Sequence, residues 1–171
     1  MTSNGTLIDA NGKWTLRFER QLAHPIDKVW RALAEPKHRD QWFPQRIEGP
    51  FEVGAEVHFV DDPNMPEEGF DGRWTSIEPP HVLELEWGTD VLRIELSPTD
   101  DGCRLVFLDR LTDVEHAART AAGWHVCLDG MAAELDGRPI PEMDEATFYE
   151  HHDKYLVEMP GPRHVWGDVP S

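Results

Sequence analysis

The sequence predicts an α+β protein in which a curved antiparallel sheet wraps around one long helix near the C-terminal end. The first observation is the sustained helical pattern of residues 114–137, where apolar side chains recur at intervals of three and four. The second is a run of strand-like stretches upstream, separated by turns too short for crossover connections, so that neighbouring strands pair antiparallel. The third is the segregation of strands from helices: one strand, two short helices, about six strands and the long helix.

The N-terminal part contains the first strand and both short helices. Residues 1–13 are polar and are expected to form a leader. Residues 14–22 alternate between apolar and polar side chains, which predicts a half-buried strand whose inner face begins with Trp14. Residues 26–33 carry an apolar stripe of helical spacing. Pro36 ends that helix and begins a second short helical turn.

The strands of the middle region are identified by alternating side chains and by the turns between them. They are expected at residues 51–60, which a turn at Gly54 divides, and at residues 69–77, 82–87, 91–97 and 103–111. The loop at residues 61–69 is rich in acidic residues and proline, and it is a candidate lid over a cavity. Its carboxylates lack the spacing of an EF-hand, which favours a solvated loop over a calcium site.

The long helix has recognisable ends, and a tail follows it. Thr112 or Asp113 can cap the helix, and Gly137 can end it in the left-handed conformation. Residues 138–171 form a C-terminal extension, in which a short amphipathic helix is predicted after Asp144. We expect this helix to pack on the body of the domain. The alternative is an arm that reaches across a dimer interface.

Composition argues against several classes of partner. The 171 residues contain 33 acidic and 16 basic side chains, a net charge of −17, which disfavours binding to nucleic acid or to an anionic membrane surface. No apolar run is long enough to span a bilayer, and the N-terminus lacks the features of a signal peptide. Cys103 and Cys127 belong to no CxxC motif and are expected to be reduced and buried, in a cytoplasmic protein.

Three stretches of the chain resemble one known family. They are HPIDKVWRALAEPKHRDQWF at 24–43, GFDGRWTSIEPPHVLELEW at 69–87 and AAGWHVCLDGMAAELDG at 121–137. Together they resemble the activator-of-heat-shock-protein-90-ATPase homologue family of the START-like, or SRPBCC, superfamily. The resemblance covers about residues 14–137, which are expected to form the START-like domain.

The resemblance implies a helix-grip fold, with about seven antiparallel strands around the C-terminal helix and two short helices after the first strand. It also implies a hydrophobic cavity between helix and sheet, where members of the superfamily bind lipids, sterols, polyketides or hormones, and some catalyse cyclisation or hydrolysis. The chaperone-activating role belongs to eukaryotic co-chaperones with an additional N-terminal domain. This chain is expected to have no room for such a domain, so that role is not carried over.

Large apolar side chains on the predicted inner faces are the candidates for a ligand-binding wall. Each of them can equally be ordinary core packing. The candidates are Phe59, Trp74, Leu85, Trp87, Ile94, Phe107, Trp124 and Leu128.

His125 and Asp109 are weak catalytic candidates, because a histidine–carboxylate pair inside a cavity can perform general acid–base chemistry. The flank of the long helix at Gly123 and His125 is where polar groups can enter an otherwise apolar space. His125 lies about 100° from Trp124 around the helix, at the edge of the apolar stripe, so a boundary histidine bonded to a neighbour is the simpler interpretation. Asp109 can equally be a strand-end residue paired with an arginine.

No cofactor or metal is expected. His151 and His152 are adjacent on a predicted helix and therefore diverge, and His116 lies elsewhere. The chain has no glycine-rich phosphate loop and no paired-cysteine zinc motif.

Three functional hypotheses remain. The first is the binding of a hydrophobic small molecule in a cavity between the long helix and the sheet. The second is a cyclase- or hydrolase-like enzyme of the same fold that uses the inward His/Asp pair. The third is a protein-interaction module or homodimer without a ligand.

Overall fold

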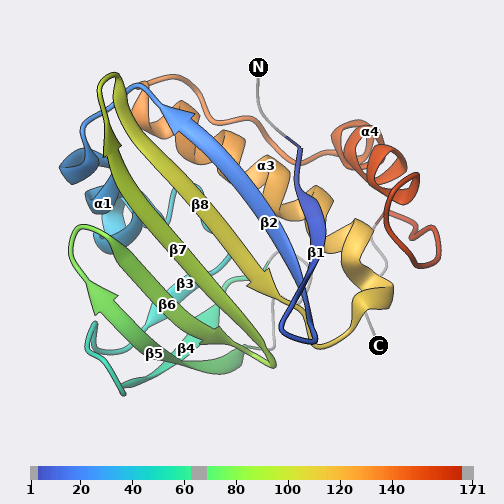
Figure 1. Ribbon diagram of the computed structural model, residues 1–171, viewed down its shortest axis with the longest axis horizontal. Coiled ribbons are helices and arrows are strands. Elements are labelled where there is room, and N and C mark those ends of the chain that lie inside the picture. Colours follow the sequence, from blue (N-terminus) through green and yellow to red (C-terminus); the bar gives the residue numbers. More distant parts are fainter. Residues whose placement is uncertain (1–3, 63–68, 167–171) are drawn as a thin grey trace.

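A single curved antiparallel sheet forms one layer of the molecule, and helix α3 lies against its concave side (Figure 1). The computed structural model describes residues 4–62 and 69–166. Within them the strand order across the sheet is β1-β2-β8-β7-β6-β5-β4-β3. The strands are β1 (Thr6–Ala10), β2 (Lys13–Leu22), β3 (Arg46–Glu48), β4 (Glu56–Val60), β5 (Phe70–Glu78), β6 (Val82–Trp87), β7 (Asp90–Thr99) and β8 (Gly102–Arg110).

The helices cover the concave side and one end of the sheet. Helices α1 and α2 connect β2 to β3 near the C-terminal end of α3, and α4 packs beside the N-terminal half of α3 (Figure 1). None of the described helices is both long and apolar enough to cross a membrane. The helices are α1 (Ile26–Ala34), α2 (Pro36–Arg39), a short 3₁₀ turn (Val114–His116), α3 (Ala117–Leu135) and α4 (Glu145–Leu156).

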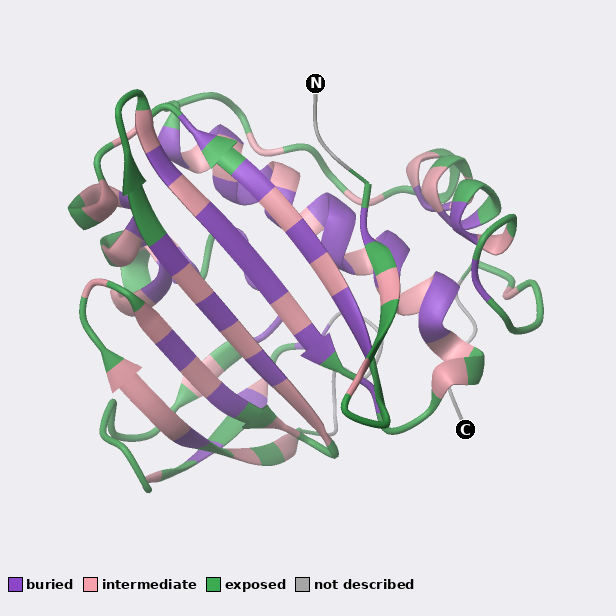
Figure 2. Ribbon diagram, in the orientation of Figure 1, coloured by how far each residue is buried: buried purple, intermediate pink, exposed green. Residues whose placement is uncertain are grey.

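The core lies between the sheet and α3, because every second residue of the central strands turns toward the helix (Figure 2). The register places Phe18 of β2 opposite Phe107 of β8, and Phe107 opposite Ile94 of β7. These three side chains form a row across the sheet and are almost completely buried. Each contributes about 1.5–3 kcal/mol by leaving water.

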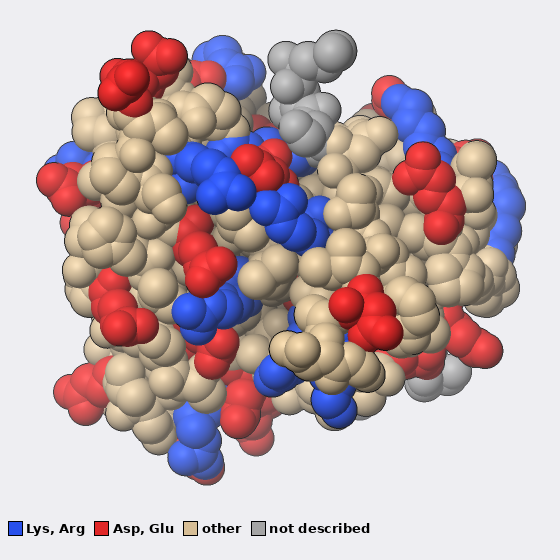
Figure 3. Space-filling view, in the orientation of Figure 1, with Lys and Arg blue, Asp and Glu red and all other residues tan. Residues whose placement is uncertain are grey.

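The convex face of the sheet carries charges of both signs (Figure 3). Glu19 lies 2.6 Å from Nε of Arg104 and 3.0 Å from Nη2 of Arg17. The hydrogen bond with Arg104, followed by the one with Arg17, lowers the pKa of Glu19 to about 2. Arg93 forms a similar bond with Glu84 at 3.1 Å. The basic side chains are therefore interleaved with carboxylates on this face and form no separate basic patch there.

The predicted helix-grip fold is confirmed, including the ends of the long helix. The Asp113 carboxylate accepts a hydrogen bond from the amide of Glu115, and the first turn that follows is 3₁₀ rather than α. Gly137 closes the helix with a positive φ of 68°. Each strand expected from alternation is present, within a few residues of its expected limits.

The segment expected to form a leader contains the edge strand β1 at Thr6–Ala10, which was not predicted. The turn between β1 and β2 is Asn11-Gly12, and both residues have positive φ. This dipeptide is the favoured two-residue turn of a β-hairpin, so the signal was present in the sequence. The alternation of β1 is weak because most of its residues remain partly or fully exposed at the sheet edge.

Two further differences concern Trp14 in β2 and the short strand β3. Trp14 is 47% exposed instead of facing the core, because it lies in the hairpin opposite Asp9, close to the turn. Strand β3 was not predicted, since three residues are too few to show a period. Residues 63–68, which include most of the acidic loop considered as a lid or calcium site, lie outside the described residues.

The predicted C-terminal helix is present as α4. Asp144 caps it by accepting a hydrogen bond from the amide of Thr147 at 2.8 Å. Phe148, His152 and Tyr155 are its buried residues. The Tyr155 hydroxyl also accepts a hydrogen bond from the amide of Gly5 at 2.8 Å, so the N-terminal segment is tied to the C-terminal extension.

Candidate functional site

An open cleft of about 540 Å³ lies between the N-terminal half of α3, the β6–β7 turn and the segment that follows β8. This volume lies within the range of about 300–1,000 Å³ that is typical of small-molecule sites. Three aromatic side chains, Phe70, Trp87 and Trp124, form much of its apolar wall. Polar groups from the surrounding loops and from α3 form the rest.

The aromatic wall continues into the core as a cluster of rings. The centroid of Trp87 lies 5.7 Å from that of Phe70 and 5.1 Å from that of Trp124. Trp124 in turn lies 4.7 Å from Phe107, which is fully buried. These distances are typical of favourable aromatic contacts, so the wall of the cleft is held by the core behind it.

A chain of hydrogen bonds fixes the second side of the cleft. The indole nitrogen of Trp87 donates to Oε1 of Gln45 at 2.8 Å, and Nε2 of Gln45 donates to Oδ2 of Asp62 at 2.8 Å. Gln45 and Asp62 are both buried. Because buried polar groups are costly without partners, these hydrogen bonds hold Trp87 in its position on the wall of the cleft.

Gly123 leaves space in the helical wall of the cleft. A Cβ atom added at this position would meet no atom within 4 Å apart from its two chain neighbours and the backbone of its own helix. The backbone there is helical, so a side chain would be accommodated without conformational strain. Gly123 is therefore a point at which the cleft can be filled without disturbing the core.

The rim of the cleft carries both acidic and basic groups. Asp90 is the first residue of β7, and Asp113 precedes the 3₁₀ turn. His116 ends that turn, and Arg119 lies in the first turn of α3. Asp90 accepts a hydrogen bond from the amide of Thr112 at 2.9 Å, which fixes its carboxylate at the rim. The mixture of signs favours a ligand without strong net charge.

Asp109 of β8 lies behind the aromatic wall and is fully buried. Its Oδ2 accepts a hydrogen bond from the indole nitrogen of Trp124 at 2.9 Å. Burial, and next the charge of Asp90, raise the pKa of Asp109 well above its usual range, whereas the Trp124 bond acts in the opposite direction. The folded chain therefore keeps the proton of Asp109 to a higher pH than an exposed aspartate would.

Replacing Asp109 with asparagine should make the stability of the protein less sensitive to a rise in pH from about 4 toward neutral. The pKa of Asp109 is raised in the folded chain above its unfolded value of about 3.9. Above that pH the native state binds more protons than the unfolded state, so the stability of the wild type falls as the pH rises. The carbonyl oxygen of asparagine can still accept the hydrogen bond from Trp124, but asparagine does not titrate. We expect D109N to match the wild type within about 1 kcal/mol near pH 4. It should become relatively more stable toward neutral pH, as measured by urea unfolding; a constant difference would contradict this.

The structure distributes the predicted ligand-binding residues between the cleft and the core. Trp87 and Trp124 line the cleft. The other candidates are buried in the hydrophobic core, and the lining residues do not include them: Phe59, Trp74, Leu85, Ile94, Phe107 and Leu128. Gly123, from the flank of the helix, also lines the cleft.

The two catalytic candidates bond to different partners. Asp109 accepts its hydrogen bond from Trp124, on the side of α3 that faces the sheet. His125 is buried on another side of α3, where Nδ1 lies 2.7 Å from the hydroxyl of Tyr155. His125 is therefore a histidine bonded to a neighbouring helix, as in the simpler of the two interpretations.

A second polar cluster was missed by the sequence reasoning. Arg20, Asp129 and His151 gather around His125 between β2, α3 and α4. Two signals existed: Arg20 continues the inward alternation of β2, and Asp129 follows His125 by one helical turn. The position of His151 depends on how α4 docks, and local periodicity does not contain that information.

Comparisons with known proteins identify the family and the fold. The family model described as Activator of Hsp90 ATPase homolog 1-like protein matches residues 23–136. No curated protein sequence matches the chain.

Solved structures resemble the chain over most of its length. A conserved protein of unknown function from Enterococcus faecalis has a TM-score of 0.74 and 21% identity, over 90% of this chain and 88% of that one. A protein from Bordetella parapertussis has a TM-score of 0.72 and 27% identity, with 95% and 94% covered. CalU16 from Micromonospora echinospora has a TM-score of 0.69 and 21% identity, with 90% and 93% covered. The shared fold thus extends beyond the segment matched by the family model.

Proposed function

The chain belongs to the family of Activator of Hsp90 ATPase homolog 1-like proteins, and from this premise we propose that it binds a hydrophobic small molecule in the cleft beside α3. The observation that carries the proposal is an open cleft of about 540 Å³ whose wall contains Phe70, Trp87 and Trp124. Trp124 is already buried, so a ligand would remove apolar surface from water mainly by covering the partly exposed Phe70 and Trp87, at about 25 cal/mol per Å².

The polar groups of the cleft suggest where the ligand carries its own polar atoms. The Asp90 and Asp113 carboxylates favour hydrogen-bond donors, and the nearby Arg119 favours acceptors. These groups sit at the rim, while the aromatic rings lie deeper. A neutral molecule with an apolar body and a few polar substituents at one end fits this arrangement best. The Hsp90 activation named in the family description is not part of the proposal.

An enzyme that uses His125 and Asp109 together is supported less well. Catalysis by a histidine–carboxylate pair requires the two groups to reach each other or the same substrate atom. The two side chains have separate hydrogen-bond partners, and neither is among the residues that line the cleft. We therefore propose binding rather than acid–base catalysis by this pair.

Replacing Gly123 with side chains of different size tests directly whether the cleft binds a ligand. The neutral fluorescent probe N-phenyl-1-naphthylamine should bind the wild type and become brighter, because the aromatic wall excludes water from it. In G123F the new ring should occupy the cleft and weaken probe binding at least about tenfold, equivalent to about 1.4 kcal/mol. The measurement is a fluorescence titration of each protein at the same concentration.

G123A is the matched control for this series. Its methyl group has free space, so probe affinity should stay close to that of the wild type. The protein should also gain about 1 kcal/mol of stability, because alanine favours a helix interior more than glycine does. If G123F folds and binds the probe as well as G123A, or if the wild type binds no neutral aromatic probe, the cleft is not a ligand site.

A further inference from the structure

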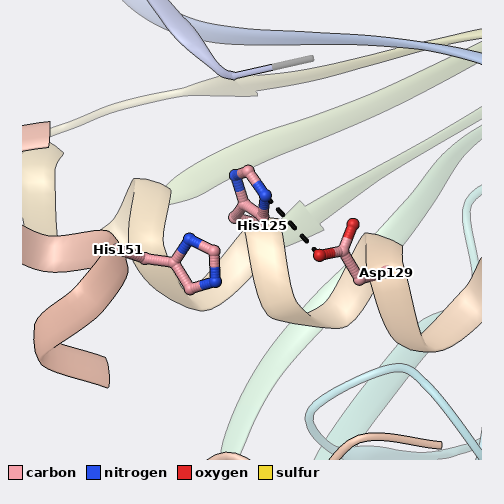
Figure 4. Close-up of side chains that lie close together, drawn as sticks. All are labelled: His125, Asp129 and His151. Atoms are coloured by element: carbon pink, nitrogen blue, oxygen red, sulfur yellow. Dashed lines mark ion pairs between the residues drawn. The ribbon is translucent and has the colours of Figure 1, made fainter. Parts of the chain in front are cut away.

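Three side chains of types that can bind metal ions lie close together on α3 and α4 (Figure 4). His125 and Asp129 lie one helical turn apart on α3, and His151 faces them from α4. One nitrogen or oxygen atom from each of the three lies within 4.8 Å of the other two. We propose that His125, Asp129 and His151 bind a divalent transition-metal ion of the zinc type.

The chemistry of the three donors fits such an ion. Two imidazole nitrogens and one carboxylate oxygen form a set that zinc and its transition-metal relatives accept, with a coordination position left for water. Bonds of about 2.0–2.2 Å to one ion place its donor atoms roughly 3–3.6 Å apart. Nε2 of His125 and Oδ2 of Asp129 are already 3.5 Å apart. This pair therefore needs little movement to share an ion.

His151 must turn to complete the site. Its ring lies 4.2 Å from that of His125 and is inclined by 30°, so the two rings are stacked rather than pointed at one centre. His151 is only partly buried. Rotation about its side-chain bonds can therefore bring a ring nitrogen toward Oδ2 of Asp129 without opening the core.

The second nitrogen of His125 is held by the protein, as in many metal-binding histidines. Nδ1 lies 2.7 Å from the hydroxyl of Tyr155, and that oxygen also accepts a hydrogen bond from the amide of Gly5. When Nδ1 donates to Tyr155, the lone pair of Nε2 faces Asp129. Such a partner orients the ring and makes it a better ligand.

The charges around the site both help and oppose a cation. Burial, followed by the charge of His151, lowers the pKa of His125 to about 4, so this ring is neutral near pH 7 and need not lose a proton to bind a metal. Arg20 of β2 and Lys154 of α4 lower the same pKa by their positive charge and would repel an ion. Arg20 Nη2 lies 3.9 Å from Oδ1 of Asp129, which leaves Oδ2 for the metal. We expect an affinity below that of a closed structural zinc site.

Metal binding would link two parts of the fold. An ion held by His125 and Asp129 of α3 and His151 of α4 would fasten the C-terminal extension to the long helix. Through Tyr155 it would also fix the segment around Gly5. The site shares no residue with the cleft, so its test is independent of the proposed function.

The test is calorimetric titration of the full chain with zinc chloride after treatment with a chelator. We expect one zinc ion per chain and no comparable binding of magnesium, which prefers oxygen donors. H151F keeps a ring stacked on His125 but removes the nitrogens, and D129N removes the charge while keeping the shape. Because loss of an outer partner alone weakens such sites about 10–100-fold, loss of a ligand should cost at least about 100-fold. Y155F removes only the outer partner of His125, so it should weaken zinc binding by about 10–100-fold.

His58 provides a control for unspecific binding. It forms an exposed pair with Asp71, Nδ1 to Oδ1 at 2.6 Å, and is not part of the three-residue group. H58F should therefore bind zinc as the wild type does. If the wild type binds no zinc at one-to-one stoichiometry, or if H151F and D129N bind it unchanged, the proposal is wrong. Should H151F fail to fold, D129N decides the question on its own.

Discussion

Replacing Trp124 with alanine is expected to lower the free energy of unfolding by at least about 4 kcal/mol. Removing a buried tryptophan side chain typically costs about 3–5 kcal/mol, and leaving a buried polar partner unpaired adds about 1–3 kcal/mol. Trp124 is 2% exposed, lies 4.7 Å from Phe107 and 5.1 Å from Trp87, and donates to Asp109. Urea unfolding followed by circular dichroism measures the loss.

Two related variants separate packing from hydrogen bonding. W124F keeps most of the ring but loses the indole N–H, so it should lose about 1–3 kcal/mol and raise the pKa of Asp109 further. W87A removes a half-buried ring and should lose less than W124A. If W124A is within about 1 kcal/mol of the wild type, Trp124 is not the anchor between the cleft and the core.

The features that the sequence predicted well are the ones with long, regular patterns. Helix α3 buries 12 of its 19 residues, and buried side chains recur in every turn along its length. Strands β6 to β8 alternate between buried and more exposed residues over most of their length. In such elements local periodicity and tertiary burial follow the same rule, so the pattern indicates the side that faces the core. The short turns between these strands predicted that neighbouring strands pair in sequence order and run antiparallel.

The fold was predicted less well where few side chains are buried. Thr6–Ala10 and Arg46–Glu48 are edge strands with mostly exposed residues, so no apolar period marks them. The Asn11-Gly12 turn did mark the first of them, but a single turn signal was outweighed by the polar composition around it. Trp14 shows the opposite error, since an apolar side chain in the right phase can still lie at the exposed end of a strand.

The cleft could be predicted only in part, because alternation shows which side chains face α3 but not how closely α3 approaches the sheet. Phe107 and Leu128 face the same interior as Trp124, yet they are in close contact with other core residues. The cleft forms where the N-terminal half of α3 leaves room beside the β6–β7 turn. Gln45 lies outside the helices and strands, so no local pattern could identify it. Asp90 begins a strand that was predicted, but the pattern of that strand does not show that its first residue lines a cleft.

His125 is expected to make the protein sensitive to acid between about pH 6.5 and pH 4. Burial, and next the charge of His151, lower its pKa from 6.5 to about 4 in the folded chain. Below pH 6.5 the unfolded state therefore binds the extra proton and the native state does not. The contribution to stability is complete above about pH 6.5 and is lost as the pH falls through about 4. It amounts to at most about 3 kcal/mol, at 1.36 kcal/mol per pKa unit.

The variant H125N isolates this effect, because asparagine can still bond to Tyr155 but does not titrate. Urea unfolding in the presence of a chelator should show the stability of H125N falling less than that of the wild type between neutral pH and pH 4. H58N, altered at an exposed position, should follow the wild type. If the free energy of unfolding falls equally with pH in H125N and the wild type, the fold does not keep His125 neutral.

The neighbouring ring provides a second test of the same cause. The charge of His151 is the second largest contribution to the lowered pKa of His125, after burial. In H151F that charge is gone while a stacked ring remains, so the pKa of His125 should rise toward 6.5 and the acid-dependent loss should become smaller. A direct titration of the His125 ring by NMR distinguishes the two contributions, since burial is kept in H151F. A pKa for His125 that stays near 4 in this variant would leave burial, with the charges of Arg20 and Lys154, as the whole cause.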